Sequence, residues 1–263
     1  MAELQEKYIY RYLTFEKLID FLETGSLHLT RMDCFEDNLE GIEPYEITEL
    51  DQIDFLEKLK NPTELNPKLS QNNIDLAIQE ITTNLRKVQT DINTRQQEIF
   101  VSCWILSNVE SFAMWDIYGK SGFALRFERE YFEKLIQDSI HLQAEPTNRL
   151  ELLIGGTVQY QNFDEMSSNE KESNLPYSFF RKHLSFRHEV EYRIVGCGEN
   201  LDATGLKFKL SKFDDSEFEI IANPRLDNLQ LRVYQNIVSR YSNTHSLQES
   251  KLKKWLNFKI IDF

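Results

Sequence analysis

The residues best suited to chemistry are two glutamates one position apart, in the stretch SFRHEVEYRIVGCG over residues 185–198. Successive side chains of a strand point to opposite faces, so Glu189, Glu191 and Arg193 are predicted to share one face. Two carboxylates at this spacing repel one another unless a cation or a bound group lies between or opposite them. This face is therefore either a solvated sheet surface or one wall of an active site.

Two further polar residues interrupt predicted strands. Arg11 lies in the middle of KYIYRYL (7–13), and Ser102 lies within EIFVSCWIL (98–106). The second segment is almost entirely apolar and β-prone, which predicts a central strand that is buried on both faces. An arginine among aromatic side chains needs a negatively charged partner, which is either a carboxylate of the sheet or a bound anion.

Aromatic side chains accompany these polar residues. Trp115 and Tyr118 belong to a predicted helical turn over residues 111–118, and Tyr12 follows Arg11 on the first strand. Large aromatic rings can stack on planar ligands, but they also dominate protein cores. Both interpretations are open at the level of the sequence.

Metal chemistry is an alternative use of the acidic residues. His183 and His188 lie five positions apart beside the glutamates and could complete a carboxylate–imidazole site. A metal-dependent hydrolase or nuclease would use four acidic residues, Asp33, Asp37, Glu189 and Glu191. The sequence has no cysteine or histidine motif with zinc spacing and no glycine-rich phosphate loop, so the leading interpretation includes no metal.

An ordered set of segments resembles a large bacterial family known as domain of unknown function 2971. The segments are YRYL, GSLHLTRMDCFEDNLEG, FVSCW, MWDIYGKSGFALRF and FRHEVEYRIV, in this order. The resemblance spans residues 8–240 and is weakest over 46–98. It supplies no activity, but it implies an intracellular bacterial or phage-associated protein of a defence or toxin system.

A more distant resemblance bears on mechanism. ADP-ribosyltransferases of the arginine–serine–glutamate type carry an arginine on the first strand, a serine at the start of the next motif strand, and a Glu-x-Glu element before a later strand. Arg11, Ser102 and the pair Glu189 and Glu191 resemble that order. The sequence departs from the pattern in having one serine, in Val-Ser-Cys, where a Ser-Thr-Ser run is usual.

This second resemblance implies that NAD is the substrate and that nicotinamide is cleaved from it through an oxocarbenium-like ribose. Glu191 would stabilise the positive charge, Glu189 would orient an acceptor or act as a base, and Ser102 would join them in the catalytic set. Arg11 would bind the NAD phosphates through its fork of donors. Stacking on nicotinamide or adenine would fall to one of three aromatic residues, Tyr12, Trp115 and Tyr118.

The elements that position these residues predict a single α+β domain over residues 1–263, with a mixed or antiparallel sheet flanked by helices. Residues 176–186 are predicted to be helical, and residues 46–98 to form a helical insertion. The insertion carries a heptad-like apolar stripe, Ile74, Ile78, Ile81, Leu85, Val88 and Ile92. This stripe packs either on its own domain or, through residues 74–92, on a second copy. A non-catalytic module that binds a ligand or protein through the insertion is the second interpretation of function.

Charge and composition limit the partners. The formal net charge is −13, which repels nucleic-acid phosphates and anionic membranes, so a small molecule or a protein acceptor is the expected partner. No apolar run is long enough to span a membrane, and MAELQEKYIYRYL lacks a signal-peptide pattern, which predicts a cytoplasmic protein. The three cysteines are far apart and form no disulfide framework.

Overall fold

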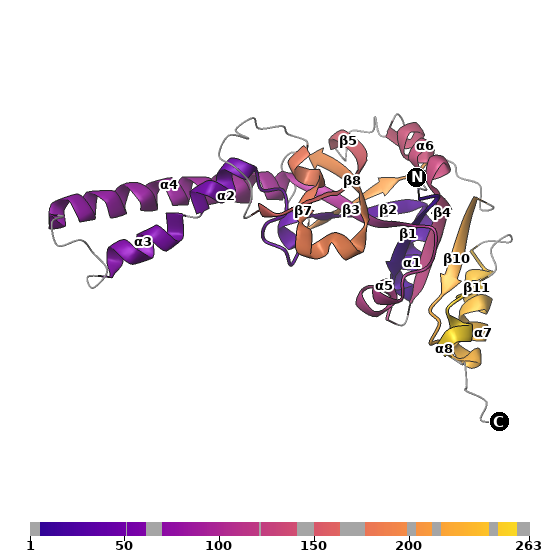
Figure 1. Ribbon diagram of the computed structural model, residues 1–263. Helices are drawn as coiled ribbons and strands as arrows, with labels where there is room; N and C mark the ends of the chain where they lie inside the picture. The colour runs from indigo at the N-terminus through magenta and orange to yellow at the C-terminus, as the bar shows by residue number, and fades with distance from the viewer. Residues whose placement is uncertain are drawn as a thin grey trace, which may run out of the picture.

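A computed structural model of the chain describes residues 6–50, 52–61, 70–120, 122–140, 150–163, 177–198, 204–211, 217–241 and 247–256. These ranges form the α+β architecture that the sequence predicts, a mixed sheet flanked by helices (Figure 1). Within them, no helix is both long enough and apolar enough to cross a membrane.

Within these described ranges, the main sheet has nine strands. They are β1 (Tyr8–Leu13), β2 (Ser26–Arg31), β3 (Ile99–Ser107), β4 (Phe123–Glu128), β5 (Leu150–Thr157), β8 (Glu191–Gly198), β9 (Gly205–Lys209), β10 (Phe218–Ala222) and β11 (Leu247–Glu249). Their order is β11–β10–β4–β1–β3–β2–β9, and β8 pairs with both β3 and β5. All these pairs are antiparallel except β10 with β11. A separate parallel pair consists of β6 (Gln159–Gln161) and β7 (Arg181–His183).

Helices cover both faces of the sheet. Helices α1 (Phe15–Thr24), α6 (Arg129–Ile140) and α7 (Asn228–Val238) contribute to the larger hydrophobic core, and α5 (Phe112–Ile117) covers a smaller one on the other face. The remaining short helices are η1 (Met32–Cys34), η3 (Tyr177–Phe180), η4 (Leu184–Glu189) and α8 (Lys253–Leu256).

Three helices form an arm that extends away from the sheet (Figure 1). They are α2 (Pro44–Leu50), α3 (Gln52–Lys60) and α4 (Gln71–Glu98), and the first two pack along α4. Ser70 caps α4 by accepting a hydrogen bond from the backbone N–H of Asn73 at 3.4 Å. In the apolar stripe, Ile74 and Ile92 are buried and the other four residues are half-buried. Part of the stripe is therefore covered within the same chain.

The strand register decides which residues share a face of the sheet. Directly opposed residues of an antiparallel pair point to the same face. Ile105 of β3 lies opposite Tyr10 of β1 and opposite Glu191 of β8, so these three side chains share a face. Ser102 and Arg11 are an odd number of positions away from Ile105 and Tyr10 along their strands. They therefore point to the opposite face from Glu191.

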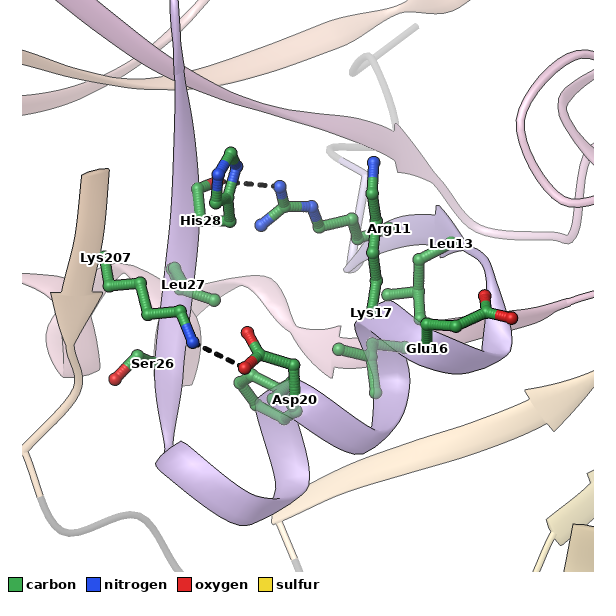
Figure 2. Close-up of a pocket in the computed structure, with 11 residues that line it drawn as sticks. Arg11, Leu13, Glu16, Lys17, Asp20, Ser26, Leu27, His28 and Lys207 are labelled. Atoms are coloured by element: carbon green, nitrogen blue, oxygen red, sulfur yellow. Dashed lines mark hydrogen bonds and ion pairs between the residues drawn. The ribbon is translucent and has the colours of Figure 1, made fainter. Parts of the chain in front are cut away.

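Strands β1 and β2 lie along the same edge of β3 but diverge from one another. β1 pairs with the C-terminal part of β3 and β2 with its N-terminal part, whereas residues 102–104 pair only with β8 among the described strands. Arg11 bridges the gap, because its Nη2 donates a hydrogen bond to the backbone oxygen of His28 on β2 at 2.8 Å (Figure 2). The sheet is therefore open beside Arg11.

The predicted helix over residues 176–186 is wrong in the described part, which begins at residue 177. The chain instead forms η3, the short strand β7 and η4. The parallel pairing of β7 with β6 and the burial of Lys182 outweigh the helical pattern, because intrinsic helix propensity is weak compared with tertiary contacts.

Candidate functional site

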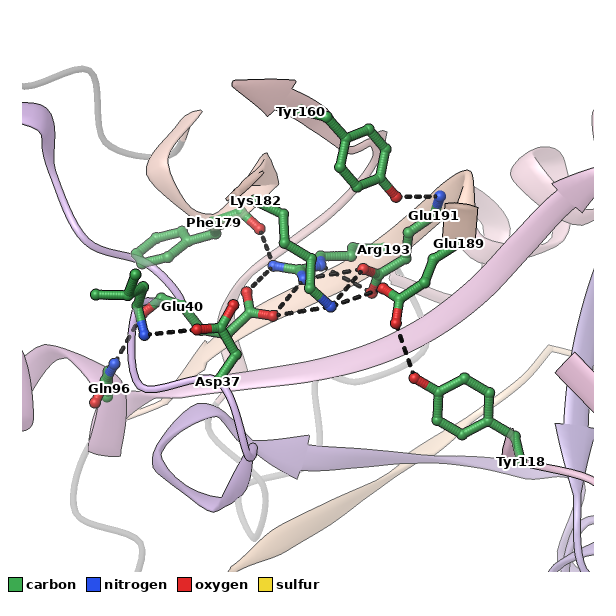
Figure 3. A network of polar contacts seen from close by, with 11 residues as sticks. Asp37, Glu40, Gln96, Tyr118, Tyr160, Phe179, Lys182, Glu189, Glu191 and Arg193 are labelled. Carbon is green, nitrogen blue, oxygen red and sulfur yellow. Dashed lines mark hydrogen bonds and ion pairs between the residues drawn. The ribbon is translucent and has the colours of Figure 1, made fainter. Parts of the chain in front are cut away.

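A fully buried guanidinium, that of Arg193, is the centre of a polar network (Figure 3). Its Nε and Nη2 donate to the two carboxylate oxygens of Glu191 at 2.9 and 3.0 Å. Its Nη1 and Nη2 donate to the two oxygens of Glu40 at 2.6 and 2.9 Å, and Nη1 also donates to the backbone oxygen of Phe179 at 2.9 Å. All five N–H groups of the arginine therefore have acceptors.

Glu40 comes from the segment between η1 and α2, far from β8 in sequence. Gly41 follows it with a φ of +70°, a left-handed conformation that turns the chain directly after the glutamate. At the end of α4, Arg95 donates to the backbone oxygen of Gly41 at 3.2 Å and Gln96 donates to that of Glu40 at 2.7 Å. The base of the arm therefore holds Glu40 toward Arg193.

The two predicted glutamates converge through a bend in the chain. The prediction that they share a strand face is wrong, because Glu189 ends η4 and β8 begins at Glu191. Val190 between them has φ 44° and ψ 57°, and among the described residues no other non-glycine residue has a positive φ. Both carboxylates reach Lys182, whose Nζ lies 2.7 Å from Glu189 Oε2 and 3.6 Å from Glu191 Oε2. A β-branched residue in this conformation is strained, and such strain concentrates at functional sites.

The two glutamates are both buried, at 5% and 2% exposed, but they have different neighbours. Tyr118 follows α5 and is 48% exposed, and its hydroxyl donates to Glu189 Oε1 at 3.0 Å. The backbone N–H of Glu191 donates to the hydroxyl of Tyr160 on β6 at 2.8 Å, and the Glu191 carboxylate lies against Arg193 inside the molecule. Glu189 is therefore at the end of the network that contacts the half-exposed Tyr118, and Glu191 at the end that Arg193 holds (Figure 3).

Opposite charges keep this network ionised. Burial alone would raise the pKa of Glu191, but Arg193, Lys182 and the Cys103 thiol together outweigh burial and hold that pKa below its usual value. Burial likewise lowers the pKa of Lys182, but the surrounding carboxylates outweigh it and raise that pKa. Burial, followed by the nearby Glu191 carboxylate, raises the pKa of the Cys103 thiol well above its usual value. At neutral pH the glutamate, the lysine and the arginine are charged and the thiol is neutral.

Arg11 and Ser102 lie on the other side of the sheet. Ser102 is buried, and its Oγ accepts a hydrogen bond from Trp104 Nε1 at 3.1 Å in the larger core. Arg11 lies beside Trp104, with its Cζ 5.5 Å from the ring centroid. The structure therefore does not bring Arg11, Ser102 and Glu191 into one site, because alternate residues of a strand face opposite sides.

Two of the three candidate stacking residues are part of the core. Trp115 is fully buried and its Nε1 donates to Glu110 at 3.2 Å. Tyr12 packs edge-on against it, with ring centroids 4.8 Å apart, and its hydroxyl accepts from the backbone N–H of Ser111. Only Tyr118 of the three contacts a predicted glutamate through a hydrogen bond in the described part of the chain.

The proposed metal ligands do not assemble. In the part of the chain that the structure describes, no three His, Cys, Asp or Glu side chains are arranged to hold a metal ion. Asp33 pairs with Arg31 at 2.7 Å, and Asp37 accepts a hydrogen bond from the backbone of its own loop. The ring of His183 instead contacts Ser185.

No sequence motif singles out Glu40 or Lys182, although both belong to the network. The local signal for Glu40 is a carboxylate directly before a turn glycine in the acidic loop over residues 31–41. Lys182 has no such signal, because a lone lysine in a polar segment is usually solvated. Both are found only when the chain is folded.

Residues 114–194 match the family model described as "Protein of unknown function (DUF2971)". This segment contains Tyr118, Lys182, Glu189, Glu191 and Arg193, so most of the network lies within the match. The match supports the resemblance to that family. Searches of curated proteins and of solved structures found no similar protein. The family description gives no activity.

The first prediction concerns Arg193. Replacing Arg193 by Met leaves the buried carboxylates of Glu40 and Glu191 without the guanidinium, so we expect the free energy of unfolding at pH 7 to fall by about 3–5 kcal/mol. Since the folded-state pKa of Glu191 is depressed, its pairing contributes stability above the unfolded-state pKa, which is lost as the pH falls through the folded-state pKa. The difference between the two proteins should therefore shrink on acidification. Urea unfolding at several pH values measures this.

The matched control is Arg225→Met, which removes the partner of Asp116 from a half-exposed surface pair. We expect it to change the unfolding free energy by less than about 1 kcal/mol. A similar loss in the two variants would show that Arg193 is not a central buried charge.

The second prediction concerns the strained backbone between the glutamates. Glycine adopts the left-handed conformation without steric cost, so Val190→Gly should leave the unfolding free energy unchanged or raise it by up to about 1 kcal/mol. Val233 has a similar exposure but lies in helix α7, and Val233→Gly should lower the unfolding free energy by about 1 kcal/mol. Urea unfolding of both variants compares them, and an equal loss in the two would contradict strain at Val190.

Proposed function

We propose that this protein is an NAD-cleaving enzyme or ADP-ribosyltransferase whose reacting ribose lies against Glu189. One observation carries the proposal. Glu189 is buried, and one of its oxygens is held by Lys182, whereas the other accepts from the hydroxyl of Tyr118, a side chain that is half-exposed and lies between Glu189 and solvent. A ribose hydroxyl can donate the same hydrogen bond when it takes the place of the tyrosine hydroxyl, so this carboxylate is suited to hold a sugar.

The chemistry fits a fixed carboxylate. The bond between ribose C1 and the nicotinamide nitrogen breaks, and its electron pair passes to the pyridinium ring, which leaves as neutral nicotinamide. Positive charge then develops on the ribose, and a negative carboxylate that is already in place stabilises it. Water or an acceptor group attacks C1 and gives up a proton to a base, for which Glu189 is the nearest candidate in this proposal.

The proposal changes the roles that the sequence suggested. Both oxygens of Glu191 are occupied by Arg193, so Glu191 becomes a positioning residue that helps hold Lys182 beside Glu189. Arg11 takes no part at this site, since it lies on the opposite face. An NAD-cleaving enzyme would suit a defence or toxin system, as the family resemblance implies.

The test is nicotinamide release from NAD by the purified protein, with and without bacterial lysate as a source of acceptors. We expect wild type to release nicotinamide. Glu189→Gln should reduce the rate by about 10²–10³-fold, the usual effect of removing one electrostatic contact to a transition state. The variant should remain folded, because Lys182 keeps Glu40 and Glu191 as carboxylate partners. Glu128→Gln, which changes a half-exposed glutamate paired with Lys7, is the matched control and should keep full activity.

Two results would overturn the proposal. One is absence of nicotinamide release by folded wild type with lysate present, and the other is equal release by wild type and Glu189→Gln. Glu191→Gln tests the positioning role of Glu191. Loss of a positioning residue should lower both the melting temperature and the rate of nicotinamide release.

A second candidate function is protein binding through the helical arm, with a second copy of the chain as the partner. It is favoured by exposed apolar side chains on the outer part of the arm, Ile53, Phe55 and Leu76. These residues are 44%, 54% and 57% exposed, although apolar side chains of this size are usually buried.

Sedimentation velocity over a range of protein concentrations tests this candidate. Wild type should form a dimer as the concentration rises, and the double variant Phe55→Ser, Leu76→Ser should remain monomeric. Glu80→Gln, on the exposed surface of the same arm, is the control and should behave as wild type. A monomeric wild type at all concentrations would exclude self-association.

A further inference from the structure

A pocket of about 350 Å³ opens beside Arg11, on the face of the sheet opposite Glu189. It lies between β1, α1 and β2, where the two strands diverge (Figure 2). Its apolar wall is formed by four residues, Leu13, Phe21, Leu27 and Leu125. Its size is at the lower end of the range for small-molecule sites.

The guanidinium of Arg11 is poorly satisfied by the protein. One of its N–H groups donates to the backbone oxygen of His28, and among the described residues no carboxylate pairs with it. Burial lowers the pKa of Arg11 to about 10, so the side chain is still charged at neutral pH although its charge is partly removed from water. Arg193, by contrast, has an acceptor for every donor. The protein therefore leaves Arg11 with donors available to an anion in the pocket.

The other charged groups of the pocket leave a second cation available. Lys207 is neutralised by Asp20, to which it is paired. Lys17 lines the pocket and has no ion-pair partner among the described residues. The carboxylate of Glu16 is engaged by its own backbone N–H and by Thr14 at the start of α1.

We propose that this pocket binds a small organic phosphate, with the phosphate on Arg11 and Lys17 and an apolar body against the leucines and Phe21. Two cations without carboxylate partners match a phosphate monoester, which carries a charge of about −1.5 to −2 at neutral pH. A carboxylate carries only one charge and would leave one of the two cations unpaired. The apolar wall favours an organic ester over inorganic phosphate, because it removes apolar ligand surface from water.

The experiment is a calorimetric titration of the protein with phenyl phosphate, benzoate and inorganic phosphate, without NAD. The result does not depend on whether the protein cleaves NAD. Phenyl phosphate should bind to wild type at least about tenfold more tightly than either of the other two. Arg11→Gln should weaken phenyl phosphate binding by about tenfold or more, because it removes a charge-assisted contact. Arg225→Gln changes a surface arginine outside the pocket and should bind as wild type does.

A second variant tests the same pocket independently, in case Arg11→Gln does not fold. Lys17 is exposed, so Lys17→Glu should fold normally, and its reversed charge should weaken phenyl phosphate binding several-fold. The proposal fails if wild type does not bind phenyl phosphate at about 10 mM. It also fails if benzoate binds as tightly as phenyl phosphate, or if Lys17→Glu binds as wild type does.

Discussion

The buried ion pairs of Arg193 are the interaction on which the rest of the structure depends. A charge without contact with water is tolerated only when partners surround it, and here the partners come from β8, from the loop before α2 and from η3. These segments must therefore meet in one arrangement. The same loop is held by the last turn of α4 through Gln96, so the orientation of the arm and the geometry of the network are set together.

The buried Arg193 and the partly exposed Arg11 have opposite relations to the protein. Every N–H group of Arg193 donates to an acceptor of its own chain, so this side chain stabilises the fold and has no donor left for a ligand. Arg11 lies where β1 and β2 separate and gives one described hydrogen bond to the protein. Strand β3 lies between them, with Cys103 on the side of Arg193 and Trp104 on the side of Arg11. The sheet therefore separates a satisfied charge from one that is available to a ligand.

The network has a buried interior and one end that contacts a half-exposed side chain. Glu191 and Arg193 form a buried ion pair, and Lys182 also lies near Glu191. Lys182 pairs in turn with Glu189, which accepts a hydrogen bond from the half-exposed Tyr118. Under the proposed function Glu189 is the catalytic group, and its ion pair with Lys182 would hold it in position. The strained conformation of Val190 makes this possible, because it turns the chain between the two glutamates.

Local sequence patterns determined most of the elements of this fold. The alternation in residues 7–13, the apolar run 98–106 and the helical turn 111–118 correspond to β1, β3 and α5 within one or two residues. The need of Glu189, Glu191 and Arg193 for charged partners was also visible, because charged residues beside an apolar strand are costly to bury alone.

The tertiary structure alone decided which of these residues meet. It directed the side chains of Arg11 and Ser102 to the face of the sheet opposite Glu191. It also turned the chain at Val190 and brought Glu40 into contact with Arg193, 153 positions away in sequence. The physical reason is that periodicity shows which residues of one strand share a face. It does not show which strands become neighbours or in what register, because that depends on contacts between distant segments.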